Sequence, residues 1–84
     1  MDAIDRVIVE LVRQWDAMDS DERNTPRGHA ILKDVQLIGQ TAAFFGGYSA
    51  MKQLHDVAEN HVGNDNSIGY WLNRMWDGIG SWLS

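Results

Sequence analysis

The fold depends on residues 37–62, which run LIGQTAAFFGGYSAMKQLHDVAENHV. Largely apolar residues recur at alternating four- and three-residue steps from Leu37 to Val62, and the phase does not slip at Gly46-Gly47. This spacing predicts one long helix. Two adjacent glycines, however, cost about 2 kcal/mol inside a helix, and they suit a C-cap followed by Ser49 as the cap of a second helix. The middle segment is therefore predicted to be either a long kinked helix or a helical hairpin at Gly46-Gly47.

Start and stop signals flank this segment. Thr25 as N-cap and Pro26 at the first helical position predict where the helix begins, and Gly63 with the polar run 64–66 predicts where it ends. Ser67 then caps a last helix whose apolar stripe continues to Trp82 and Leu83. We expect helix throughout this half of the chain.

The N-terminal part has the clearest amphipathic pattern. Apolar residues at three- and four-residue steps from Ile4 to Met18 predict a helix over residues 3–18. Asp2 is placed to cap the first turn, and Asp5 adds negative charge where the helix dipole favours it. Val9, alone on the polar side, hints at a contact there. The polar run 19–26 is expected to be a surface loop.

Size and composition place these helices in one domain. The chain has 84 residues, 44% of them hydrophobic, and no cysteine, which fits a small globular unit spanning residues 1–84 rather than a disordered or disulfide-rich protein. We predict an all-α bundle of three or four helices. Its expected core contains Leu11, Trp15, Ile38, Phe44, Met51, Leu72, Met75 and Ile79.

The charge is unevenly distributed. Residues 1–22 hold seven acidic and two basic residues, so the whole net charge of −5 lies in that segment. Such a field repels phosphate backbones, which argues against direct nucleic-acid binding and favours a protein partner with a basic surface. Asp16, Asp19 and Asp21 are candidate contacts for it. An acidic N-terminus does not resemble a secretory signal, and we expect a cytoplasmic protein.

Small residues suggest a close helix contact. Gly39, Ala43, Gly46 and Ala50 lie at steps of four, three and four, on one line if the helix is continuous. The stripe predicts either a contact within the chain or the seam of a homodimer. Residues 35–51 carry no charge, but polar residues interrupt them and seventeen residues are at the lower limit for a membrane span, so we do not favour one.

Tryptophan supplies the second candidate surface. Tryptophan is enriched at interface hot spots but belongs first to the core of a small helical domain. Trp15 and Trp71 are expected in the core. Trp76, at the edge of its apolar stripe, and Trp82 and Leu83, at the end of the chain, are predicted to face a partner.

No catalytic or metal-binding motif stands out. His55 and Glu59 are four residues apart and Asp56 is adjacent, but His61 points elsewhere on the helical wheel and no His-Glu-x-x-His arrangement is present. No serine or threonine has a recognisable base partner, and there is no phosphate-binding glycine loop. We therefore expect no metal, no cofactor and no enzymatic activity.

The sequence thus predicts a non-enzymatic protein-interaction module, a small regulator, adaptor or inhibitor that binds a partner protein or a second copy of itself through a helix face. One alternative is a small acidic inhibitor of a nucleic-acid-binding machine, of the kind that phages or mobile elements encode. Another alternative is a small membrane-associated protein.

Overall fold

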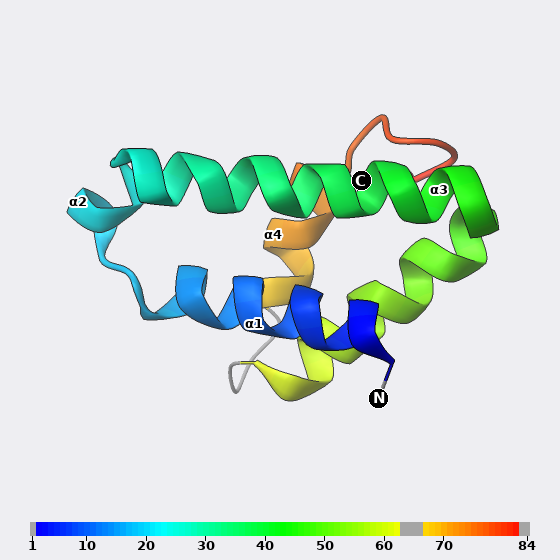
Figure 1. Ribbon diagram of the computed structural model, residues 1–84, viewed down its shortest axis with the longest axis horizontal. Coiled ribbons are helices and arrows are strands. Elements are labelled where there is room, and N and C mark those ends of the chain that lie inside the picture. Colours follow the sequence, from blue (N-terminus) through cyan, green and yellow to red (C-terminus); the bar gives the residue numbers. More distant parts are fainter. Residues whose placement is uncertain (1, 63–66, 83–84) are drawn as a thin grey trace.

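The computed structural model describes residues 2–62 and 67–82. In these residues the chain forms α1 (Ala3–Ala17), the short α2 (Ser20–Arg23), α3 (Pro26–His61) and α4 (Ser67–Met75). Figure 1 shows α1 running side by side with the first part of α3, and α4 lying across them. The prediction of a small all-α bundle is confirmed.

The long helix α3 is sharply kinked at Gly47. The backbone there has φ 65° and ψ −154°, a conformation essentially restricted to glycine. Residues 26–46 form a first arm, and residues 48–61 form a second arm that turns back beneath it (Figure 1). The middle segment is therefore a kinked helix that doubles back. The apolar spacing that continues across the two glycines does not form one continuous face.

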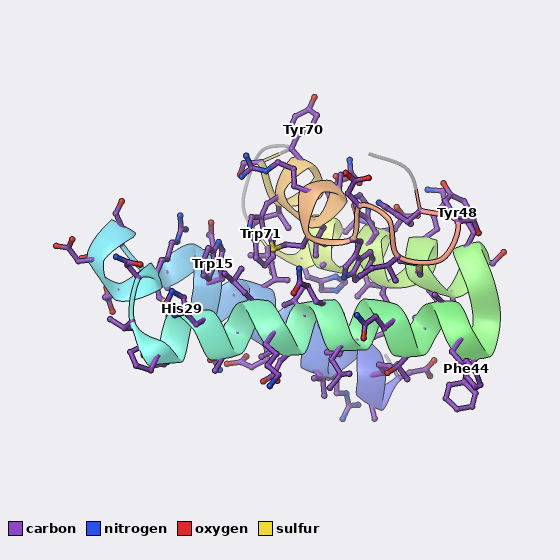
Figure 2. The ribbon with its side chains drawn as sticks, turned by 90° about the horizontal axis from the view of Figure 1, so that it is seen from above. Trp15, His29, Phe44, Tyr48, Tyr70 and Trp71 are labelled. Carbon is purple, nitrogen blue, oxygen red and sulfur yellow. The ribbon has the colours of Figure 1, made fainter. Side chains whose placement is uncertain are left out.

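The helix α4 packs its inner face against the other elements. The ring of Trp71 stacks on Trp15 of α1, with centroids 5.3 Å apart (Figure 2). Just after α4, the indole N–H of Trp76 donates to the Val35 carbonyl of the first arm at 2.9 Å. His55 of the second arm lies 3.1 Å from the Gly69 carbonyl. These contacts join both arms of α3 and α1 around one core.

The predicted core is largely correct. Met51 and Leu72 are fully buried, and five other predicted residues pack against the buried cluster in half-buried positions: Leu11, Trp15, Ile38, Met75 and Ile79. Phe44 is a wrong prediction, because 83% of it is exposed. A continuous helix would put Phe44 and Met51 on one face, and the bend at Gly47 separates their faces.

The helix ends in residues 2–28 agree only in part with the prediction. Asp2 occupies the N-cap position, but its side chain makes no capping hydrogen bond. The predicted surface loop 19–26 contains α2, which begins with a capping box: Asp19 accepts from the Glu22 N–H at 2.8 Å, and Glu22 accepts from the Asp19 N–H at 3.3 Å. The predicted start of α3 is confirmed, since Thr25 accepts from the Gly28 N–H and Pro26 is its first residue.

The predicted last helix ends earlier than expected, at Met75. Gly78 and Gly80 adopt φ 86° and 58°, which no helix accommodates, and the chain turns back after them. Trp82 then packs edge-on against Trp76 with centroids 5.4 Å apart. The apolar residues beyond Met75 thus reach the core through a turn.

Gly47→Ala tests the bend. A Cβ at this position meets nothing within 4 Å, so the substitution acts only through the backbone conformation. We expect a loss of roughly 1–3 kcal/mol in the free energy of unfolding, measured by chemical denaturation. Ser49→Ala, exposed two residues later, is the control and should change stability by less than about 0.5 kcal/mol. Equal stability of the two variants would mean that α3 is not bent at Gly47.

Candidate functional site

Two phenylalanines project from the end of the first arm. Phe44 and Phe45 are 83% and 82% exposed, and their rings contact each other edge to face with centroids 5.0 Å apart. Figure 2 shows Phe44 pointing away from the body of the molecule. Large apolar side chains gathered on a surface are typical of an interaction site.

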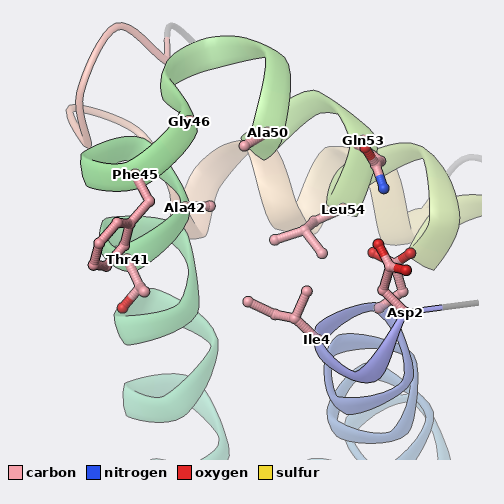
Figure 3. A pocket seen from close by; sticks show the side chains of 10 residues that line it. Asp2, Ile4, Thr41, Ala42, Phe45, Gly46, Ala50, Gln53 and Leu54 are labelled. Atoms are coloured by element: carbon pink, nitrogen blue, oxygen red, sulfur yellow. The ribbon is translucent and has the colours of Figure 1, made fainter.

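A pocket of about 300 Å³ lies beside them, between the first turn of α1 and the two arms of α3 (Figure 3). Its wall combines apolar and polar side chains from three segments of the chain: Asp2, Ile4, Asp5, Thr41, Ala42, Phe45, Gly46, Ala50, Gln53 and Leu54. Ile4 and Leu54 face each other across it, and Asp2 lies beside Gln53 (Figure 3). We call the exposed Ile4, Phe44 and Phe45 together with this pocket the apex surface.

Asp5 contributes an unusual group to the pocket wall. Among the described residues it is the one charged side chain that is buried, with 4% of its surface exposed. Its Oδ1 atom has no hydrogen-bond partner in the described part of the chain. Burial of a carboxylate oxygen without a partner is unfavourable, and charged side chains are rarely buried unless paired. The dipole of α1 offsets part of this cost, because Asp5 lies in its first turn.

The sequence analysis missed Asp5 as a site residue. The buried residues of α1 are Asp5, Ile8, Val9 and Val12, so the helix turns its inner face toward the Val9 side, and Ile4 and Val7 are left exposed. The contact suggested by Val9 is present. Asp5 precedes the other three by three, four and seven residues, and this spacing was the available signal that its side chain lies on the buried face.

The predicted outward position of Trp76 and Trp82 is wrong. Trp76 is fully buried, and only 5% of Trp82 is exposed. The hydrogen bond of Trp76 to Val35 holds the first indole inside, and the second packs against Trp76, His55 and Tyr48. Leu83 lies outside the described residues. Neither indole is available to a partner in this conformation.

The small-residue stripe is divided by the bend. A Cβ on Gly39 would lie 2.5 Å from the Trp76 indole nitrogen, so this glycine makes room for the buried ring. Ala43 lies against Gly80 in the same way. Gly46 and Ala50 face each other across the bend and line the pocket instead. The four residues therefore serve two separate contacts within the chain and form no single line.

The predicted acidic contacts lie at the other end of the molecule, near α2 (Figure 1). Asp16, Asp19 and Asp21 are all exposed. Asp19 is engaged in the capping box of α2, and the guanidinium of Arg23 donates to the Trp15 carbonyl and lies over the Trp15 ring. Within the described residues, the carboxylates of Asp16 and Asp21 have no such role in holding the fold.

The candidate ligands on the second arm have structural roles. His55 contacts the Gly69 carbonyl and the Trp82 ring, Glu59 packs against the Gly69 backbone, and His61 contacts the Val57 carbonyl. Asp56 accepts a hydrogen bond from Lys52, which raises the pKa of Lys52. In residues 2–62 and 67–82 no three His, Cys, Asp or Glu side chains are close enough to hold a metal ion.

Comparison with protein-family models, curated proteins and solved structures finds no match for this chain. The site is therefore interpreted from its own geometry. None of the helices in the described part of the chain combines the length and apolar character that a membrane span requires.

Trp76→Ala tests whether this side chain belongs to the core. Loss of a fully buried indole and its hydrogen bond to Val35 is expected to lower the free energy of unfolding by about 3–5 kcal/mol, enough to unfold much of a domain this small. Tyr70→Ala on α4 removes an exposed aromatic ring and is expected to change stability by less than about 0.5 kcal/mol. Thermal unfolding followed by circular dichroism measures both; a stable, folded Trp76→Ala protein would contradict the packing described.

Asp5→Asn tests the cost of the buried carboxylate. Removal of its charge removes a burial cost of about 1–3 kcal/mol. It also loses the roughly 0.3–1 kcal/mol by which the helix dipole stabilises the charge. We expect the free energy of unfolding to rise by about 1 kcal/mol. The exposed Asp34, in the middle of the first arm, supplies the control Asp34→Asn. A loss of stability specific to Asp5→Asn would show that Asp5 has a partner in solution.

Proposed function

We propose that this chain is a non-enzymatic protein-interaction module that binds a partner protein through its apex surface. The observation that carries the proposal is the pair Phe44 and Phe45, each more than four-fifths exposed and in contact with the other. The same chain buries three tryptophans in its core, so the exposure of the two phenylalanines does not mean that the fold cannot bury large aromatic side chains. Burial of each phenylalanine in an interface is favourable by about 1.5–3 kcal/mol.

The partner is expected to carry a basic surface. The net charge is −5, and Asp2 and Asp5 line the same pocket as Phe45. Opposite charge accelerates encounter and orients the partner, while the apolar contacts provide most of the affinity. An interface of ordinary size covers about 800 Å² on each protein, roughly 15% of the 5248 Å² of accessible surface on this chain.

Variants at the two ends of the molecule test the proposal. Proteins retained by the immobilised chain are compared with those retained by Phe44→Ala/Phe45→Ala and by Asp16→Lys/Asp21→Lys. We expect the apex variant to lose its partner and to stay as stable as the wild type, because both rings are exposed. The acidic-end variant should retain the partner.

Tyr70→Ala serves as the matched control for removal of an exposed aromatic ring. Loss of the partner with the acidic-end variant alone would contradict the proposal and favour the inhibitor of a nucleic-acid-binding machine. Light scattering over a dilution series identifies a second copy as the partner: in that case the wild type is dimeric and the apex variant monomeric.

A further inference from the structure

The pocket of the apex surface contains a buried carboxylate, that of Asp5, whose hydrogen bonding the described residues do not satisfy. The Oδ1 atom of Asp5 is buried and has no hydrogen-bond partner among the described residues, yet the side chain lines an open pocket. A buried carboxylate requires a hydrogen-bond donor or a cation. The pocket is therefore expected to receive one.

The other side chains of the pocket wall limit which hydrogen-bond donor or cation can bind there. Metal ions such as Ca²⁺ take six to eight oxygen ligands, whereas this wall offers the carboxylates of Asp2 and Asp5 and few other polar groups. The Thr41 hydroxyl already donates to the Leu37 carbonyl at 2.8 Å. Much of the rest of the wall is apolar, including Ile4 and Leu54. A cationic group on an apolar stem matches this combination.

We propose that the pocket binds an arginine side chain of the partner protein. A guanidinium carries five N–H donors in a planar fork, which lets one group serve both acidic residues of the wall, Asp2 and Asp5. The methylene stem of the arginine would pack between Ile4 and Leu54, which face each other across the pocket (Figure 3). Phe45 lies across the pocket from Asp2 (Figure 3), where it would contact the partner surface around the arginine.

The source of the arginine is a protein and not a free small molecule, because Phe44 and Phe45 extend the apolar surface beyond the pocket. A ligand held in the pocket alone would leave Phe44 uncovered. This inference rests on the proposed function, and it specifies how a basic partner surface is recognised.

Binding of isolated side-chain analogues tests the inference. N-acetyl-arginine amide is titrated into the ¹⁵N-labelled full chain, with N-acetyl-citrulline amide as the uncharged analogue of the same shape. We expect saturable shifts of amides lining the pocket, with a Kd on the order of millimolar for so small a ligand, and none with citrulline. N-acetyl-lysine amide should bind more weakly, since a compact ammonium lacks the planar fork of donors that can serve both Asp2 and Asp5.

Matched variants separate a pocket from general attraction by the acidic chain. Asp5→Asn should weaken arginine binding at least about tenfold while the chain stays folded. Asp34→Asn makes the same change in net charge on the exposed side of the first arm and should leave binding unchanged. Shifts centred on Asp16 and Asp21, or equal binding by wild type and Asp5→Asn, would overturn the inference.

The outcome is distinguishable from that of the partner experiment. If arginine does not bind and partner capture still requires Phe44 and Phe45, the role of the pocket is overturned and the interaction function stands. If arginine binds through Asp5 but capture is indifferent to the phenylalanines, the pocket chemistry stands and the proposed function is overturned.

Discussion

The backbone conformation of Gly47 is the constraint on which the other features depend. Because residue 47 has φ 65° and ψ −154°, the second arm of α3 leaves the bend in a new direction, and α1 and α4 pack against the bent helix. The same bend leaves Phe44 and Phe45 without a neighbouring element to cover them, and opens the pocket where the first turn of α1 meets both arms. Fold and candidate site therefore have one local origin.

Inside the bundle, glycine and tryptophan act as complementary pairs. Gly39 gives the Trp76 ring room to approach the first arm, and the indole N–H then finds its acceptor in Val35. Gly78 and Gly80 let the chain reverse, which brings Trp82 onto Trp76. A helix through these residues would carry Trp82 away from the core. The glycines that weaken α4 as a helix thus allow its C-terminal extension to be buried.

Local signals in the sequence predicted most of the helices but not how their faces meet. Thr25-Pro26 predicted the start of α3, because capping depends on neighbouring residues alone. The Asp19-x-x-Glu22 spacing carried an equally local signal for α2 that was not recognised. Phe44 was misplaced because a helical wheel assumes that the helix continues through the glycines. The spacing of Asp5 from Ile8, Val9 and Val12 carried a signal for its burial, but the missing hydrogen-bond partner of its Oδ1 within the described residues depends on what packs against α1.

The apex of the molecule reverses the usual distribution of polar and apolar groups. Within the described residues, a carboxylate oxygen of Asp5 is buried there without a hydrogen-bond partner, while two phenylalanines at the same end of the molecule are exposed to water. Each arrangement is unfavourable for the isolated chain, and neither is required by the bend, since a neutral residue at position 5 and smaller residues at 44 and 45 are compatible with the same backbone. One event relieves both costs: a surface that covers the phenylalanines and inserts a cation beside Asp5. The conjunction of the two at one end therefore argues more strongly for a partner than either feature alone.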